Sequence, residues 1–177
     1  MTYKSYLEIF VPLDTKRKWY SELKEYLSDV DVMWQNAYFH ITMAFLDETP
    51  KDLEKITSLL KRHLTGFCAP VITFDSLDAF TTPSGLHFIT LTSSTIPKEF
   101  VSLTDTVRHD IIDAGGKIES EFKPHVTLGR VRESNIALEH LQSKLRRFVV
   151  SPIELTLTEV DFRKFRGEVL FKTTLPI

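Results

Sequence analysis

Apolar residues recur along the chain with two different spacings, which alternate from one segment to the next. Short runs rich in aromatic and β-branched residues predict strands at 4–11, 30–35, 38–46, 71–80, 86–91, 117–122, 125–131, 153–162 and 169–175. Apolar residues spaced by three or four positions predict helices at 15–28, from Pro50 to Gly66, from Pro97 to Gly115, and from Ser134, a candidate N-cap, through Leu145. Helices and strands are therefore interleaved over the whole length.

The order of these elements is similar in the two halves of the chain. Each half contains a strand, a helix and a strand that carries a His-x-Thr tripeptide. Several strands follow one another directly, which favours antiparallel pairing over a purely parallel sheet. The pattern predicts an α+β fold in which residues 1–177 form one domain with two similar lobes.

Composition narrows the class of protein. Hydrophobic residues make up 42% and charged residues 26% of the chain, values that are typical of a soluble globular domain. The formal net charge of −2 differs from the basic balance of proteins that bind many phosphates of a long nucleic acid. A small nucleotide or a single RNA end remains compatible with this charge.

Cysteine content and the apolar runs indicate the cytoplasm. Cys68 is the one cysteine, so no intramolecular disulfide can form, as is usual in a reducing compartment. The N-terminal residues lack the apolar core of a signal peptide, and no apolar run approaches the roughly 20 residues that a membrane helix needs. We therefore expect a soluble cytoplasmic protein that does not insert into a membrane.

Each His-x-Thr tripeptide is a polar pair within an apolar strand, His40 and Thr42 in the first half and His125 and Thr127 in the second. Residues i and i+2 of a strand point to the same face, so the imidazole and the hydroxyl of each pair lie side by side. A polar pair in an apolar strand costs free energy unless it is hydrogen-bonded or used. Chance alone gives about 0.6 such tripeptides in a chain of this composition, so the strand context carries the signal.

These residue types suit the cleavage of a phosphodiester. One group must take a proton from the nucleophile and another must give a proton to the leaving oxygen, and histidine, with an unperturbed pKa of about 6.5, can do either. Threonine hydroxyls can donate hydrogen bonds to the non-bridging phosphate oxygens. On strict alternation, Ala44 and Gly129 continue the polar faces and leave room for a substrate. The pattern by itself leaves open the alternative of two structural histidines.

Around these residues the sequence resembles the 2H phosphoesterase superfamily, most of all its bacterial branch of 2′-5′ RNA ligases, which are RNA 2′,3′-cyclic phosphodiesterases. The segment 40–46, HITMAFL, matches the family pattern H-[ILV]-T-[ILM]-x-F-L, and the segment 122–130, FKPHVTLGR, matches F-x-P-H-[VI]-T-[IL]-[AG]-R. Trp34 and the order of elements between the motifs extend the resemblance over nearly the whole chain.

The resemblance implies two pseudo-symmetric α/β lobes with antiparallel sheets flanking a central cleft. It also implies metal-independent hydrolysis of a cyclic or 2′-5′ phosphodiester, with His40 and His125 as the acid–base pair and Thr42 and Thr127 as phosphate ligands. We assign His125 as the general base and His40 as the general acid, an order that the pseudo-symmetry would also allow to be exchanged. The chain departs from many relatives at Met43 and Ala44, where a basic residue is common, so the exact substrate stays open.

The further candidates for substrate binding are basic or aromatic. Arg130 belongs to the second motif, but strict alternation places it on the face opposite that of Thr127 unless the strand twists or bulges. Lys164, Phe165 and Arg166 lie in the turn between the last two strands, where positive charge and an aromatic ring suit a phosphate and a base. We therefore expect these four residues to be the next most informative positions after the two tripeptides.

The expected partner is an RNA end or a cyclic nucleotide, bound by a monomer without metal or cofactor. Zinc would need three or four ligands at suitable spacing, which two strand histidines with threonine partners do not supply. We expect His87, a further strand histidine, to have a structural or surface role. Two alternatives remain: a 2′-5′ oligonucleotide phosphodiesterase or ligase of the same superfamily, and a non-catalytic RNA-binding module.

Overall fold

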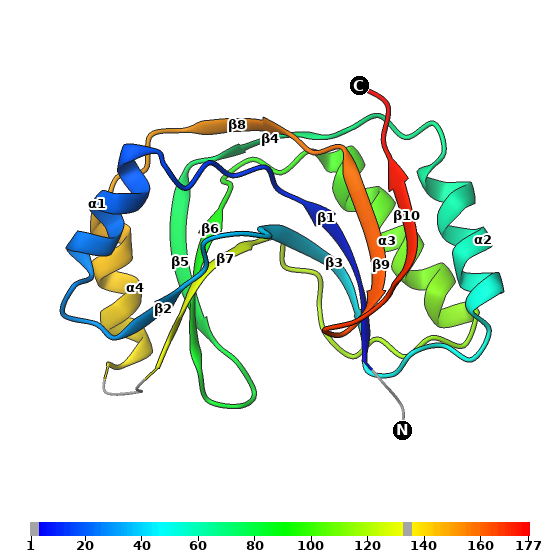
Figure 1. The fold of residues 1–177 in the computed structure, drawn as a ribbon, viewed down its shortest axis with the longest axis horizontal. Coiled ribbons are helices and arrows are strands. Elements are labelled where there is room, and N and C mark those ends of the chain that lie inside the picture. Colours follow the sequence, from blue (N-terminus) through cyan, green and yellow to red (C-terminus); the bar gives the residue numbers. More distant parts are fainter. Residues whose placement is uncertain (1–3, 133–135) are drawn as a thin grey trace.

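The computed structural model describes residues 4–132 and 136–177. Figure 1 shows the helices gathered at the two ends of the molecule, with the strands between them. The helices are α1 (Lys18–Tyr26), α2 (Leu53–Leu64), α3 (Lys98–Asp113) and α4 (Leu138–Arg147). The strands are β1 (Ser5–Phe10), β2 (Val32–Trp34), β3 (His40–Leu46), β4 (Val71–Phe74), β5 (Ser76–Thr81), β6 (His87–Thr92), β7 (Val126–Val131), β8 (Ile153–Thr156), β9 (Glu159–Lys164) and β10 (Val169–Thr174).

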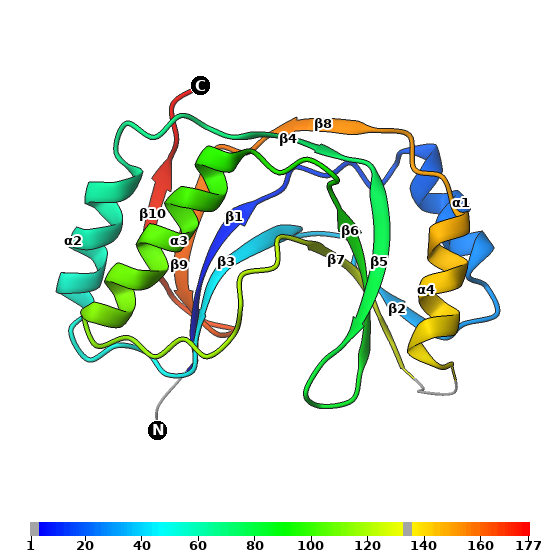
Figure 2. The same ribbon diagram turned by 180° about the vertical axis from the view of Figure 1, so that it is seen from behind.

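An eight-stranded antiparallel sheet runs through both lobes in the order β10-β9-β1-β3-β7-β6-β5, with β2 paired to β7. The two lobes meet where β3 and β7 pair through Ile41 and Val126. Strands β1, β9 and β10 lie on the β3 side with α2 and α3, whereas β2, β5 and β6 lie on the β7 side with α1 and α4 (Figure 2). This arrangement confirms the predicted α+β fold with two antiparallel lobes.

The lobes do not correspond to the two halves of the sequence. After β1 the chain crosses to the other lobe for α1 and β2, and it then returns for β3 (Figures 1 and 2). It crosses again for β5 and β6, returns for α3, crosses a third time for β7 and α4, and ends in β9 and β10 beside β1. Segments that are far apart in the sequence are therefore neighbours within each lobe.

The core explains why apolar residues alternate with those of the tripeptides. Ile41 and Met43 on β3, and Val126 and Leu128 on β7, are fully buried among the other apolar residues of the core. The tripeptide residues between them point to the opposite side of the sheet, which we call the inner face. The helices lie on the outer side of both lobes (Figure 1).

Strand β3 contains a β-bulge directly after its threonine. Where β3 pairs with β1, Leu7 lies opposite Ala44 and Glu8 lies opposite Thr42, so Met43 is the extra residue. A bulge of this kind reverses the alternation of faces beyond it. Ala44 is therefore buried in the core, and the expectation that it would continue the polar face is wrong.

Strand β7 has the same irregularity at the equivalent position. Where it pairs with β6, Thr90 lies opposite Thr127 and the next pair involves Gly129, so Leu128 is the extra residue. Gly129 was expected to leave room for a substrate, but the structure gives a different reason for the glycine. It allows the close approach of β2, because an added Cβ would come within 2.6 Å of the Val32 side chain. The two motif strands thus share a backbone geometry as well as a tripeptide.

Some predicted strands differ from those observed. Residues 117–122 form an irregular loop, in which the Ser120 carbonyl accepts a hydrogen bond from Arg108. The runs 71–80 and 153–162 each divide in two, because their first parts pair as the separate sheet of β4 and β8. Ser134 lies outside the described residues. In the described ranges, no helix is long and apolar enough to cross a bilayer.

Candidate active site

The junction of β3 and β7 brings the two His-x-Thr tripeptides together. The strands run antiparallel, and the central residues of the two tripeptides lie opposite each other. This register sets His40 beside Thr127 and Thr42 beside His125 on the inner face of the sheet. The imidazoles occupy one diagonal of a four-residue cluster and the hydroxyls occupy the other, so that all four side chains surround the junction.

Both imidazoles are held in the same way, through Nδ1. In His125 this atom lies 2.6 Å from the carbonyl oxygen of Lys123, and in His40 it lies 3.2 Å from the carbonyl oxygen of Tyr38. A carbonyl oxygen can only accept, so Nδ1 carries the proton and donates it in each contact. In the neutral ring, Nε2 is then the unprotonated nitrogen that can act as a base.

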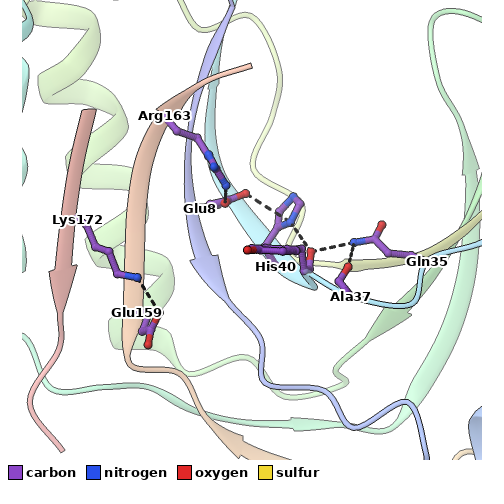
Figure 3. Close-up of polar contacts among 8 residues, drawn as sticks. Glu8, Gln35, Ala37, His40, Glu159, Arg163 and Lys172 are labelled. Carbon is purple, nitrogen blue, oxygen red and sulfur yellow. Dashed lines mark hydrogen bonds and ion pairs between the residues drawn. The ribbon is translucent and has the colours of Figure 1, made fainter. Parts of the chain in front are cut away.

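The loop before β3 sets the direction of the Tyr38 carbonyl. Tyr38 has a left-handed backbone conformation with φ of 58°, which costs a non-glycine residue about 1–2 kcal/mol. The side-chain amide of Gln35 donates hydrogen bonds to the carbonyls of Ala37, at 3.1 Å, and Tyr38, at 2.8 Å (Figure 3). The carbonyl of Gln35 in turn accepts a hydrogen bond from the hydroxyl of the buried Tyr20. Hydrogen bonds therefore connect the core to the ring of His40.

A buried carboxylate lies beside His40 (Figure 3). Glu8 on β1 is 7% exposed, with Oε2 at 3.4 Å from Nδ1 of His40 and Oε1 at 3.6 Å from a guanidinium nitrogen of Arg163 on β9. Burial raises the pKa of Glu8, while the positive charges of His40 and Arg163 act in the opposite direction. The sequence interpretation missed both residues, although Glu8 is the one charged residue in the apolar run 6–11.

The surroundings of His125 are less polar. Its ring packs edge-on against Phe80, with 5.0 Å between the ring centroids. The pKa of His125 is lowered, chiefly by burial and further by the positive charge of His40, although the hydrogen bond to the Lys123 carbonyl acts the other way. Among the residues that the structure describes, no acidic side chain contributes to this shift.

A cavity of about 860 Å³ is bordered by Thr42 and His125 of the cluster, whereas His40 and Thr127 are outside its lining. Its lining includes Thr42 and Phe45 from β3, Phe80 from β5, Thr90 from β6, and His125. Both lobes therefore contribute to its walls. The volume falls within the range of about 300–1,000 Å³ that small-molecule sites occupy, which suits a ligand of nucleotide size.

The bulge in β7 brings Arg130 to the inner face. Arg130 lies opposite Phe88 on β6, and its guanidinium group is 5.1 Å from the centroid of that ring. Its side chain is exposed on the same face as Thr127, which strict alternation did not predict. Arg130 is outside the set of residues that line the cavity.

The turn between β9 and β10 is only partly directed toward the tripeptides. Phe165 is 49% exposed and lies 6.4 Å from the ring of Tyr6, which itself stacks on His40 at 6.2 Å. Lys164 is paired with an acidic residue of its own turn at 3.0 Å, and Arg166 lies over the ring of Phe165 at 5.3 Å. Phe165 is thus connected to His40 through one aromatic ring, whereas the two cations contact their own turn.

The remaining strand histidine has a structural environment, as expected. His87 is buried, and its ring nitrogens lie 2.8 Å from the Thr81 hydroxyl and 3.0 Å from the Ile136 carbonyl. Over residues 4–132 and 136–177, no group of three or more His, Cys, Asp or Glu side chains is arranged to hold a metal ion.

Known proteins share this architecture. The apo form of E. coli LigT has a TM-score of 0.61 at 20% identity, with 99% of both chains covered. Its complex with 3′-AMP has a TM-score of 0.63 at 19% identity, covering 99% of this chain and 96% of that one. Usb1 of Kluyveromyces marxianus has a TM-score of 0.63 at 10% identity, with 99% of both chains covered. No curated protein matches the chain by sequence.

The sequence itself supplies the family. At identities of 20% or less, the solved structures establish the shared fold alone. The model of the 2′-5′ RNA ligase superfamily matches residues 13–168, a range that includes both motif strands and most of the chain. The chain therefore belongs to the 2′-5′ RNA ligase superfamily, the 2H phosphoesterases that its tripeptides resemble.

Proposed function

We propose that the protein is a metal-independent phosphodiesterase that hydrolyses a 2′,3′-cyclic phosphate at an RNA end or on a nucleotide. The observation that carries the proposal is the four-residue cluster at the β3–β7 junction, in which each imidazole has Nδ1 bound to a carbonyl. Such a cluster offers a base, an acid and two hydroxyl donors to one phosphate. The adjacent cavity has room for the attached nucleoside.

In the proposed reaction His125 is the general base. Its Nε2 takes a proton from a water molecule, whose oxygen attacks phosphorus. The base must start in its neutral form, and the lowered pKa of His125 supports this role. Thr42 and Thr127 donate hydrogen bonds to the non-bridging oxygens, where negative charge accumulates in the transition state.

His40 is the general acid. As the bond between phosphorus and one ribose oxygen breaks, the imidazolium of His40 gives its Nε2 proton to that oxygen. The ring opens to a ribose monophosphate with one free hydroxyl, and the oxygen of the water stays on phosphorus. The carboxylate of Glu8, 3.4 Å from Nδ1, favours the protonated imidazole that this step requires. Proton exchange with solvent then restores both histidines.

The ligands of related structures support a nucleotide substrate. E. coli LigT has been solved with phosphate, with 3′-AMP and with ATP. Each of these ligands carries a phosphate, and two of them carry a nucleoside, which are the parts that the cluster and the cavity would hold here. Phe80 at the cavity wall offers an aromatic face for a base.

The family description favours one alternative, hydrolysis or ligation of a 2′-5′ phosphodiester in an oligonucleotide. The same acid–base pair would serve this reaction, because the bond also joins phosphorus to a ribose oxygen. The two substrates differ in what must fit beyond the phosphate, so they are separated by a substrate panel. A non-catalytic RNA-binding module would use the cavity without the proton transfers.

The test is turnover of nucleoside 2′,3′-cyclic monophosphates, and of a short RNA with a cyclic end, in excess EDTA. His40→Ala and His125→Ala remove the acid and the base separately, and each is expected to lower kcat by about 10²–10⁴-fold. His109→Ala is the matched control, because His109 is exposed on α3 and contacts the Asp105 carbonyl of its own helix. This control should keep full activity.

The outcomes distinguish the candidates. Turnover that survives EDTA and needs both histidines supports the proposal, and the position of the phosphate in the product identifies the leaving oxygen. Cleavage of 2′-5′-linked dinucleotides without cleavage of cyclic phosphates would transfer the proposal to the alternative substrate. If the folded protein binds RNA and turns over none of these substrates, the proposed enzymatic activity is refuted.

A further inference from the structure

We infer that Glu8 is the positioning residue that makes His40 the acid of the pair, because its carboxylate orients the imidazole and stabilises its protonated form. The inference rests on the proposed function. It explains how two similar tripeptides on a pseudo-symmetric sheet take different roles. It also adds to the reaction a residue that lies outside both motifs.

The two lobes differ at the residue opposite each motif threonine. Glu8 on β1 lies opposite Thr42, and Thr90 on β6 lies opposite Thr127. Both motif strands bulge directly after the threonine, so these two positions are equivalent. The hydroxyl of Thr90 donates to the carbonyl of Asp78 at 3.1 Å and carries no charge. A carboxylate in one lobe therefore takes the place of a neutral, satisfied hydroxyl in the other.

Both charged contacts of Glu8 are ion pairs that are longer than an ordinary hydrogen bond. Within the described part of the chain, its Oε2 has no hydrogen-bond partner, although this atom is 3.4 Å from Nδ1 of His40. Its Oε1 is 3.6 Å from Arg163. A buried carboxylate held at these distances costs free energy that an apolar residue would avoid. The charge itself is therefore what this position supplies.

The charges nearest to His40 come from β1 and β9. Glu8 and the stacked ring of Tyr6 face it from β1. On β9, Asp161 is paired with Glu8 and Arg163 is paired with Tyr6. The negative charge of Asp161 raises the pKa of Glu8, and the positive charge of Arg163 lowers it. Two carboxylates and one guanidinium group thus surround this side of the site, which leaves a negative balance beside the imidazole.

The remaining charged groups do not cancel this balance. Lys172 on β10 lies opposite Asp161 and is also paired with Glu159 at 3.1 Å, so this further cation comes with a further carboxylate and the balance stays negative. On the β7 side, His125 is the titratable group that interacts with His40, and the two imidazoles disfavour each other's charge. A carboxylate therefore lies beside one imidazole of the pair, whereas the other faces the ring of Phe80.

The first test compares Glu8→Gln with Glu159→Gln in the dependence of kcat/KM on pH, with a nucleoside 2′,3′-cyclic monophosphate as substrate. A general acid produces an alkaline limb, because activity is lost as the acid deprotonates. Removing the charge of Glu8 is expected to move this limb to lower pH by about one unit or more, so that kcat/KM above the limb falls about tenfold. Glu159→Gln removes the same charge from the partner of Lys172 and should leave the profile unchanged.

A second variant gives the opposite sign. Arg163→Gln removes the positive charge on the far side of Glu8 and is expected to move the alkaline limb to higher pH. If Glu8 and Arg163 acted only through stability, the alkaline limb would not move in opposite directions in the two variants. Arg163→Gln also keeps the inference testable if Glu8→Gln does not fold.

A measurement without substrate separates this inference from the proposed function. The imidazole NMR titration of His40 in the free protein should have a lower midpoint in Glu8→Gln than in the wild type, and an unchanged midpoint in Glu159→Gln. If the wild type turns over no phosphodiester, the proposed function fails whatever the titration gives. If the wild type is active and neither the alkaline limb nor the His40 midpoint moves in Glu8→Gln, the role of Glu8 is refuted.

Discussion

Removing the side chain of Gln35 should weaken the catalytic role of His40 indirectly, through the loop that precedes β3. Gln35→Ala loses the hydrogen bonds to the carbonyls of Ala37 and Tyr38, which together contribute about 2 kcal/mol. The left-handed backbone of Tyr38, with φ of 58°, costs about 1–2 kcal/mol. Because the two quantities are similar, the loop without Gln35 has little to hold the Tyr38 carbonyl against Nδ1 of His40. The Nδ1 proton of the ring then keeps the Glu8 carboxylate as its one nearby acceptor among the described residues, and the orientation of the imidazole is less well defined.

We expect Gln35→Ala to lower kcat/KM by about tenfold, equivalent to about 1.4 kcal/mol of transition-state stabilisation, and to lower the free energy of unfolding by about 1–2 kcal/mol. Adding Tyr38→Gly should restore a large part of the activity, since glycine adopts positive φ without the steric cost. The control is Tyr26→Phe, which removes a hydrogen bond to the Lys144 carbonyl between α1 and α4. It should lose stability alone.

The assays are kcat/KM for a cyclic nucleotide and urea unfolding of the same preparations. Wild-type activity in a measurably destabilised Gln35→Ala would show that the Tyr38 carbonyl is not what positions His40. Failure of Tyr38→Gly to restore activity in that background would refute the role given to backbone strain. Equal losses of activity in Gln35→Ala and Tyr26→Phe would reduce the effect to stability.

Other parts of the site give further predictions. Gly129→Ala should lower the free energy of unfolding by about 1–3 kcal/mol, because its Cβ would lie 2.6 Å from the side chain of Val32, and an unchanged urea midpoint would contradict that close approach. The acid limb of kcat/KM should lie below pH 6.5, because the pKa of His125 is lowered from 6.5 and the base must be neutral, whereas a limb above this value would assign the base elsewhere. Phe80→Ala should raise KM by about 5–150-fold, the equivalent of about 1–3 kcal/mol for one stacked base, and an unaltered KM would exclude stacking on this ring.

The sequence could predict those parts of the site that depend on local structure. A histidine and a threonine two positions apart in a strand share a face in any fold, so the pairing within each tripeptide needed no tertiary information. The Nδ1 contacts are also local, since each acceptor is the carbonyl two residues before the histidine. The resemblance then brought the two tripeptides together, and the β3–β7 register agrees with it.

The positions of residues beyond each tripeptide could not be predicted, because the bulges arise from pairing with other strands. Strict alternation predicted that Ala44 shares a face of the sheet with Thr42 and that Arg130 is on the face away from Thr127. Both predictions are wrong, because each strand contains one extra residue at its bulge. The sequences of β3 and β7 do not indicate that one residue of each will have no partner on β1 or β6. The same reasoning explains Gly129, whose constraint comes from the approach of β2.

The acid side of the site depends on an interaction between the two ends of the chain. Glu8 comes from the first strand and Arg163 from the next to last, and they meet because β1 pairs with β9. A charge in an apolar strand could have directed attention to Glu8, but its partners follow only from the topology. The tripeptides supply a symmetric pair of histidines, whereas β1 and β9 supply the charge that distinguishes them. A relative with both tripeptides and a neutral residue at this position would therefore need another source for the same distinction, such as the charge of its substrate.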